Sequence, residues 1–254
     1  MIRHTKSLVA YRESSQGFLD FVALVSHAVP RLSTSLNAGE SPPKPDHFQR
    51  KPNKREALEA SIVLYEGELA RTTLITVFSY FEMYIRSALV EVLEFHGGKE
   101  AFIATALRRS QRFLGPLAME VAASKAKLQE REKKAKRDRY VKHTRILNTH
   151  CYRFPTELLS PYGVRQLAAK ATNKKGLRAY EIPEVLEFGL LFPLLTVDAE
   201  RFHELREKRN AIGHGAGATL DLRYSLKAAS DLHALASRVD SHIVNHFFVV
   251  ERFA

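Results

Sequence analysis

The apolar periodicity of residues 55–95, the longest helical pattern in the chain, constrains the fold more than any other feature. Its apolar side chains recur every three or four residues, as they do along one face of an α-helix, and Gly97 and Gly98 mark its end. At 1.5 Å per residue such a helix is about 60 Å long. Only other helices, from this chain or another, can cover so long a stripe. The stripe consists of Ile62, Leu69, Leu74, Phe78, Phe81, Ile85, Leu89 and Val92.

Helical patterns account for most of the remaining sequence. Pro30 is a point at which the first predicted helix can break, and prolines make residues 37–54 a loop. Pro183 opens a strongly apolar helix, and Thr196 or Asp198 is the expected N-cap of the next one. No strand and no internal repeat are evident, so we predict an all-α fold. In addition to the helix 55–95, we predict helices over 5–37, 117–147, 183–195, about 196–213 and 221–250. The stretch 153–175 is irregular and contains a short helix.

The positive charge is concentrated in one segment. The chain has a formal net charge of +11. Residues 100–180 hold 19 Lys and Arg against 6 Asp and Glu, whereas the remainder holds 20 against 22. This imbalance favours a polyanionic partner and assigns that partner to the central segment. We therefore divide the chain into an N-terminal helix and proline-rich loop (1–54) and a helical domain (55–254) that contains a basic segment (99–180).

The cysteine content and hydropathy predict a cytoplasmic protein. Cys151 is the only cysteine, so the chain has no intrachain disulfide, which fits a reducing compartment. The apolar run 18–29 contains Asp20 and His27 and is too short to span a bilayer. No small-residue cleavage site follows it, as one would in a signal peptide. We expect no membrane association.

The candidate chemistry lies in residues 206–215, with the sequence REKRNAIGHG. Arg209 carries a permanent charge and a donor fork that suits phosphate, and His214 has the side chain that titrates nearest neutrality. In RNA the 2′-hydroxyl can attack the adjacent phosphate, so cleavage needs only a proton carrier and a cation on the phosphoryl oxygens. We assign these roles to His214 and Arg209, with Asn210 orienting the histidine or contacting a phosphate. The alternative is a helix C-terminus that favours cations through its dipole.

The spacing sets a geometric condition. Five residues separate Arg209 from His214, which places them about 140° apart on an ideal helix. They share a face only if the helix ends between them, and Gly213 offers that ending because glycine accepts the left-handed conformation.

Residues 209–214 (RNAIGH) match the Arg-x4–6-His signature of the HEPN superfamily, and residues 205–210 (LREKRN) are similar to its lead-in. The helix 55–95, above all its YFE segment at 80–82, resembles the first core helix of these proteins. The chain is similar to the RiboL-PSP-type branch, and the resemblance covers about 55–95 and 185–250. It implies a HEPN-like helical bundle, within which 99–180 is an insertion.

The resemblance implies a metal-independent endoribonuclease that acts as a homodimer, with the motifs of two subunits facing each other. The products would be 2′,3′-cyclic phosphate and 5′-hydroxyl ends. Members are proposed to be toxins or antiviral defence effectors, which implies a potential antitoxin or defence-system partner protein. Glu82 would then be a site carboxylate paired with Arg209, or alternatively a solvated helix residue. The competing function is a non-catalytic helical module that binds nucleic acid or a partner protein.

The basic segment is the candidate RNA-binding surface, although a solvated charged helix explains the same charges. We expect no cofactor, since neither a GxxxxGK[ST] nor a GxGxxG loop is present. We also expect no metal, because His242 and His246, four residues apart, have no third ligand nearby. The predicted RNA-binding residues are Lys125, Lys127, Arg131, Lys133, Lys134, Lys136, Arg137 and Arg139.

Overall fold

The computed structural model describes residues 2–40, 55–112, 123, 161–173, 176–215 and 220–248, and within them every regular element is a helix. The predicted all-α class is therefore confirmed for this part of the chain. In order, the elements are α1 (Lys6–Asn37), α2 (Arg55–Phe95), α3 (Lys99–Arg112), α7 (Pro161–Thr172), the 3-10 turn η2 (Ala179–Glu181), α8 (Ile182–Glu184), the π-helical turn η3 (Val185–Gly189), α9 (Thr196–Gly213) and α10 (Leu222–His246).

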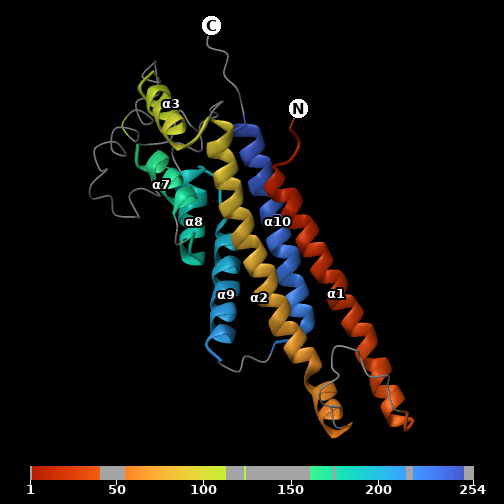
Figure 1. Ribbon diagram of the computed structural model, residues 1–254. Coiled ribbons are helices and arrows are strands. Elements are labelled where there is room, and N and C mark those ends of the chain that lie inside the picture. The colour runs from red at the N-terminus through yellow and green to blue at the C-terminus, as the bar shows by residue number, and fades with distance from the viewer. Residues whose placement is uncertain are drawn as a thin grey trace.

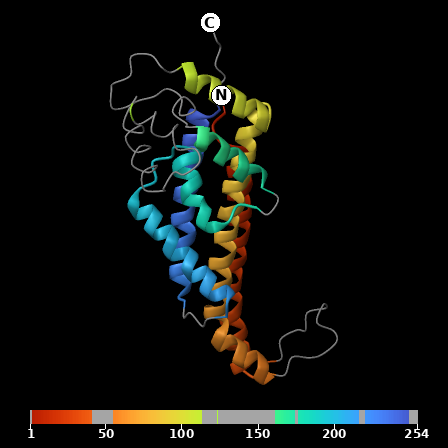
Figure 2. The same cartoon turned by 90° about the vertical axis from the view of Figure 1, so that its left-hand side faces the viewer.

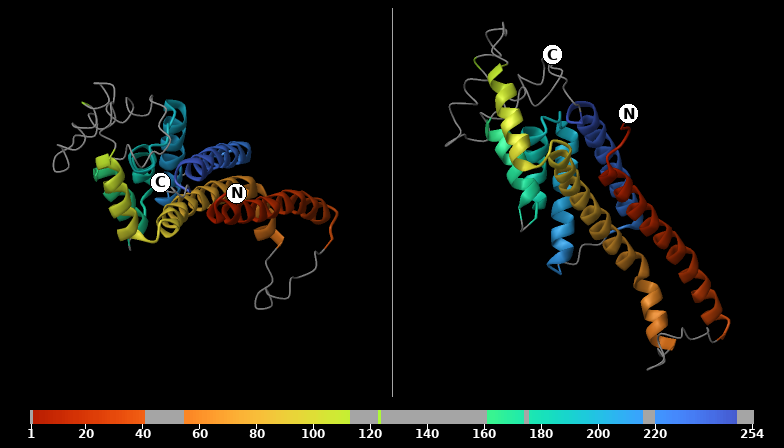
Figure 3. Two further views of the ribbon diagram at one scale, coloured as in Figure 1. Left: turned by 90° about the horizontal axis from the view of Figure 1, so that it is seen from above. Right: turned by 45° about the horizontal axis from the view of Figure 1, so that its top comes forward.

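Helix α2 is the axis of a bundle, with α1 and α9 on opposite sides and α10 alongside (Figures 1 and 3). Helices α1 and α9 run antiparallel to α2. Helix α10 runs parallel to α2, as two hydrogen bonds show. Ser225 Oγ donates to the Ala70 carbonyl at 2.8 Å, and further along both helices Tyr84 OH donates to the Ala236 carbonyl at 3.1 Å. The C-terminal end of α1 and the N-terminal end of α2 extend beyond the ends of α9 and α10 (Figure 2).

The prediction for α2 is confirmed at both ends. The helix spans Arg55–Phe95, and Gly97 and Gly98 then adopt φ of +84° and +100°. The Gly98 N–H reaches back to the Leu93 carbonyl at 2.8 Å, which closes the last turn. Neighbouring helices bury seven of the eight predicted stripe residues, all except Ile62.

The predicted helix 5–37 is confirmed, and the break that Pro30 allows does not occur, because α1 continues through Pro30 to Asn37. A proline inside a helix removes one backbone hydrogen bond and crowds the preceding turn. Here Pro30 is largely solvent-facing, and Thr34 Oγ1 donates to its carbonyl at 3.0 Å. The remaining helical hydrogen bonds and the packing against α2 hold the helix together.

The helix predicted from Pro183 to about Leu195 ends earlier than expected. The π-helical turn closes when the Leu190 N–H donates to Val185 O at 3.0 Å, and Leu191 then takes a left-handed φ of 50°. The sequence explains the end, since Pro193 disfavours a helical conformation at the residue before it. The apolar run continues past this point because Leu191 and Phe192 are buried although they lie outside a helix.

Two further helix ends differ in detail. The N-cap of α9 is Leu195, which offers no side-chain acceptor, so neither Thr196 nor Asp198 has the predicted capping role. Asp198 instead forms an ion pair with Arg238 on α10 at 2.7 Å. Helix α10 ends at His246, before the predicted residue 250, and Asp221 caps its start by accepting from the Arg223 N–H at 3.0 Å.

One apolar core joins the described helices. The N-terminal helix contributes Leu8 and Tyr11 to it. Helices α3 and α7, which lie within the predicted basic insertion 99–180, contribute Phe102 and Val164. None of the described helices combines the length and apolar character needed to cross a bilayer. The predicted helix 117–147 and the proline-rich loop beyond residue 40 lie outside the described residues, apart from the single position 123.

Candidate active site at the end of α9

The backbone at the end of α9 differs from the predicted geometry. Gly213 is the last helical residue and keeps a right-handed conformation, whereas Gly215 has the left-handed φ of +74°. The His214 N–H still donates to the Asn210 carbonyl at 3.0 Å, so the last helical turn positions His214. The helix therefore ends at Gly213, between Arg209 and His214, as expected, but Gly213 does not adopt the expected left-handed conformation. The left-handed conformation falls on Gly215, two residues later, so it follows His214 and does not turn that residue back toward Arg209.

Arg209 is held against α2. Its Nη2 donates to Glu82 Oε2 at 2.8 Å, and its guanidinium carbon lies 5.5 Å from the centre of the Phe78 ring. Phe78 and Glu82 are four residues apart and therefore share one face of α2. Arg209 Nη1 also donates to Asn210 Oδ1 at 3.0 Å. These contacts fix both the position and the plane of the guanidinium.

Glu82 is largely shielded from solvent. Its side chain is 19% exposed and that of Arg209 is 31% exposed. Burial raises the pKa of Glu82 above its ordinary value, and the neighbouring Arg209 charge offsets part of that rise. Glu82 is thus a partly desolvated carboxylate paired with Arg209, which is the pairing that the resemblance implies, and not a solvated helix residue.

His214 is exposed at the tip of the helix. Among the described residues, no hydrogen bond or ion pair joins its side chain to Arg209, Asn210 or Glu82. The structure therefore brings Glu82, Arg209 and Asn210 into one contact group and leaves His214 at its edge. The eight predicted RNA-binding residues between Lys125 and Arg139 lie outside the described residues.

Sequence reasoning missed two features that position the site. One is the aromatic base under Arg209, in which Phe78 stacks on Phe202 of α9 with ring centres 5.3 Å apart. The apolar spacing of α2 places Phe78 in the core but does not identify its partner.

The second is a polar network that ties α9 to α10. Glu204 accepts from Arg201 at 2.6 Å and from the Tyr224 hydroxyl at 2.9 Å, and Lys208 Nζ lies 3.3 Å from it. The hydrogen bond from Arg201, with those from Tyr224 and Lys208, lowers the pKa of Glu204 to about 2. Arg201 also donates to Asp231 of α10 at 3.0 Å. The network anchors the turn of α9 that precedes Arg209.

The two histidines considered as metal ligands, His242 and His246, are partly buried on α10. His242 Nε2 is 2.8 Å from the Leu190 carbonyl, and burial lowers the pKa of His242 to about 4. Within the described ranges, no group of three His, Cys, Asp or Glu side chains has the arrangement of a metal site. His242 therefore acts as a neutral hydrogen-bonding group between α10 and the chain that follows η3.

Comparison with known proteins gives no relative, since no family model, curated protein or solved structure matches the chain.

Proposed function

We propose that this chain is a metal-independent endoribonuclease of the HEPN type, with a HEPN-like helical bundle as its fold. One observation carries the proposal: Arg209 is anchored by Glu82 at 2.8 Å, one turn before a solvent-exposed His214. An oriented cation and an accessible imidazole are the two groups that cleavage by an internal 2′-hydroxyl requires.

In this mechanism the substrate supplies the nucleophile. His214 removes the proton from the 2′-hydroxyl, which attacks the adjacent phosphorus. Arg209 stabilises the charge on the phosphoryl oxygens, and the bond from phosphorus to the 5′-oxygen breaks as that oxygen takes a proton from His214 of a second subunit. A guanidinium has five N–H donors, and Glu82 and Asn210 engage two of them. The remaining donors are the ones that would bind phosphate. The products are a 2′,3′-cyclic phosphate and a 5′-hydroxyl.

The proposal includes a homodimer with the site at its interface. The late reversal at Gly215 leaves Arg209 and His214 about 140° apart around the helix axis. One histidine also serves poorly as base and acid in the same step. A second subunit supplies another His214 near each Arg209, so the separation within one chain supports a site shared between two chains.

The wider role that we propose is that of a toxin or antiviral defence effector in the cytoplasm, with RNA bound along the basic segment around residues 125–139. An antitoxin or defence-system protein is the corresponding partner. The concentration of positive charge in residues 100–180 supports the RNA contact.

The test is an RNA cleavage assay in EDTA with wild type, Arg209→Ala and His214→Ala. We expect cleavage by the wild type and a loss of about 100-fold or more in each variant. His203→Ala is the matched control, since His203 lies on the same helix, six residues before Arg209. Full activity of His214→Ala would refute the assigned roles.

The alternative function is a non-catalytic helical module that binds nucleic acid or a partner protein. The ion pair between Arg209 and Glu82 favours it, because that pair also explains Arg209 as a structural link between α9 and α2. RNA binding without cleavage under any condition would support this alternative.

A further inference from the structure

Two further arginines lie one helical turn from the contact between Arg209 and Glu82. Arg206 precedes Arg209 by three residues on α9, and Arg86 follows Glu82 by four residues on α2. Residues three or four apart are neighbours on a helix surface. Because α9 runs antiparallel to α2, both steps lead in the same direction, toward the C-terminal end of α2 (Figure 1). Arg86 and Arg206 therefore lie on facing helices at the same level of the bundle.

Arg206 also lies between the two groups of the proposed site. Around the axis of α9 it is about 60° from Arg209 and about 80° from His214 on the other side. An anion bound by Arg206 is therefore next to one bound by Arg209, on the side of the helix that leads to His214.

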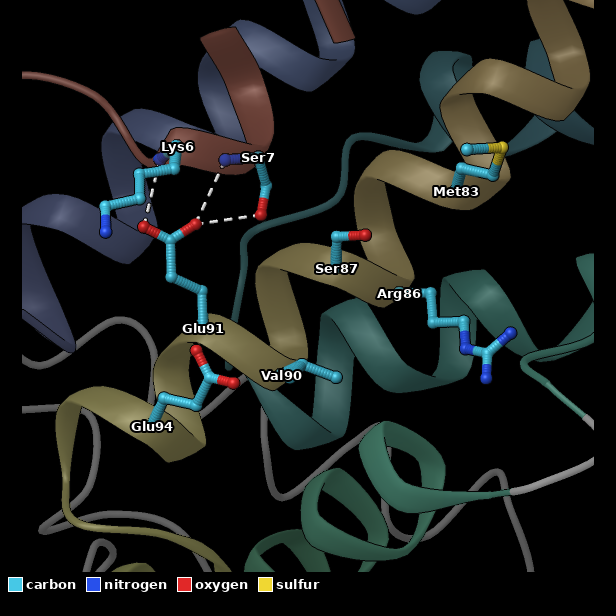
Figure 4. Close-up of a pocket in the computed structure, with 8 residues that line it drawn as sticks. All are labelled: Lys6, Ser7, Met83, Arg86, Ser87, Val90, Glu91 and Glu94. Carbon is cyan, nitrogen blue, oxygen red and sulfur yellow. Dashed lines mark hydrogen bonds between the residues drawn. The ribbon is translucent and has the colours of Figure 1, made fainter. Parts of the chain in front are cut away.

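Neither added arginine has a close carboxylate among the described residues. Arg206 is 22% exposed, and its Nη2 lies 3.7 Å from Oε1 of Glu207, a side chain that is itself 74% exposed. Arg86 is exposed, and no ion pair joins it to another residue in the described ranges. Figure 4 shows its guanidinium directed away from Glu91 and Glu94, the carboxylates that line the same hollow. Both guanidiniums therefore keep their charge and most of their N–H donors for an anion.

The turn η2 brings an exposed aromatic ring to the same place. Arg86 Nη1 lies 3.5 Å from the position that a Cβ at Gly176 would take. Four residues later, η2 packs against α9 and carries Tyr180, which is 53% exposed. The Tyr180 hydroxyl accepts from Arg178 Nη1 at 3.4 Å, which restrains the ring. An exposed ring beside cations is the combination with which proteins bind single-stranded nucleic acid.

We propose that Arg86 and Arg206 bind a second phosphate of the RNA, adjacent to the one on Arg209, and that Tyr180 stacks on the neighbouring base. The guanidinium fork suits phosphate because it offers two parallel N–H donors. One helical turn rises about 5.4 Å, which is close to the separation of successive phosphates in an extended single strand. Only an unpaired base can turn a free face to the Tyr180 ring.

The substrate class is therefore single-stranded RNA that continues beyond the scissile phosphate. A dinucleotide has one phosphate and cannot occupy the second position. The cationic site and the exposed ring are observed independently of catalysis, whereas the identification of the anion as RNA rests on the proposed ribonuclease function. The competing occupant is an acidic peptide, which supplies carboxylates but no base for the ring.

The first test measures binding, by fluorescence anisotropy of a labelled 2′-O-methyl oligoadenylate that has no free 2′-hydroxyl to attack. Arg86→Gln and Arg206→Gln should each weaken binding about tenfold. Each should also reduce the slope of log K against log salt by about 0.7, since one phosphate contact is lost. Arg31→Gln, at an exposed position of α1, is the matched control and should change neither quantity. Arg206→Lys keeps the charge and should keep the slope.

Two substitutions at Tyr180 test the stacking. Tyr180→Leu should weaken binding of the same oligonucleotide by about 5-fold to 100-fold, whereas Tyr180→Phe keeps the ring and should bind as the wild type does. Equal losses in both variants would overturn the stacking. An unchanged salt slope in both Arg86→Gln and Arg206→Gln, or a wild type that does not bind the oligonucleotide, would overturn the phosphate position.

Substrate length separates this proposal from the ribonuclease function. The wild type should cleave a trinucleotide, which has two phosphates, faster than a dinucleotide, and Arg86→Gln should reduce that preference. Binding that depends on both arginines without any cleavage refutes only the proposed function. Cleavage by a wild type that shows no length preference refutes only the second phosphate position. Binding of polyglutamate as tightly as the oligonucleotide, with the same dependence on Arg86 and Arg206, would overturn the assignment to RNA.

Discussion

Arg209 has two roles at the scale of single residues. It links α9 to α2 through Glu82 and Phe78, and it is the proposed phosphate ligand. The same contacts that stabilise the bundle also fix the orientation of the guanidinium. A cation positioned before substrate binds needs little rearrangement in the transition state.

The structural role of Arg209 can be measured apart from catalysis. Arg209→Ala leaves Glu82 partly desolvated and unpaired and should lower the free energy of unfolding by about 1–3 kcal/mol. Adding Glu82→Gln removes that unpaired charge and should recover part of the loss. Urea unfolding of the two variants and the wild type measures both effects. Equal stability of all three proteins would contradict the ion pair.

His242 gives the bundle a defined acid sensitivity. Its pKa is about 4 in the folded chain against 6.5 as the ordinary value, so the unfolded chain binds the proton more readily. Stability is then fully present above pH 6.5 and is lost as the pH falls toward 4, by up to about 3 kcal/mol. His242→Gln should flatten the dependence of unfolding free energy on pH in this window. An unchanged profile in the variant would show that another group titrates.

At this scale the sequence predicted the candidate residues but only part of their geometry. The motif identified Arg209, Asn210 and His214, and the resemblance suggested Glu82. The position of the chain reversal was not predictable, since Gly213 and Gly215 both tolerate a left-handed conformation. Phe78 as the base under Arg209 depends on how α9 crosses α2, which periodicity within one helix does not contain.

At the scale of elements, two carboxylates hold the start of α1. Asp240 is fully buried and accepts from the Thr5 hydroxyl and from the Thr5 N–H at 3.3 Å. Glu91 accepts from the Lys6 and Ser7 N–H groups at 2.9 and 3.0 Å. The donors at a helix N-terminus lack partners within the helix, so α10 and α2 supply acceptors for them.

We therefore expect Thr5 to contribute to the free energy of unfolding. Thr5→Ala removes the cap that its hydroxyl provides to the Leu8 N–H and one hydrogen bond to buried Asp240. We expect a loss of about 2 kcal/mol in the free energy of unfolding. Thr34→Ala, at an exposed position of the same helix, is the control and should cost much less. Similar losses in both variants would contradict the anchoring role.

The elements also show where periodicity is reliable. It predicted α2 as a helix over about 55–95, and the structure confirms that helix, because a stripe of this length has no other explanation. It failed between Leu190 and Leu195, where the buried residues Leu191 and Phe192 continue the apolar run outside a helix. It was right for α1, which runs through Pro30 to Asn37 as the predicted helix 5–37 does.

For the whole molecule, the packing of α9 against α2 brings Arg209 into contact with Glu82, although the two residues lie 127 positions apart in the chain. The same packing leaves His214 exposed at the end of α9. The all-α class was predictable from composition and spacing, whereas the contact between Arg209 and Glu82 depends on how α9 crosses α2.

The central claim is that Arg209 and His214 cleave RNA through its own 2′-hydroxyl. The most direct test compares wild type with His214→Ala in EDTA, on one RNA and on the same sequence with 2′-deoxy sugars. We predict that only the wild type cleaves, only the RNA is cut, and the new ends are 2′,3′-cyclic phosphates. Cleavage of the deoxy strand, or undiminished cleavage by His214→Ala, would contradict the account.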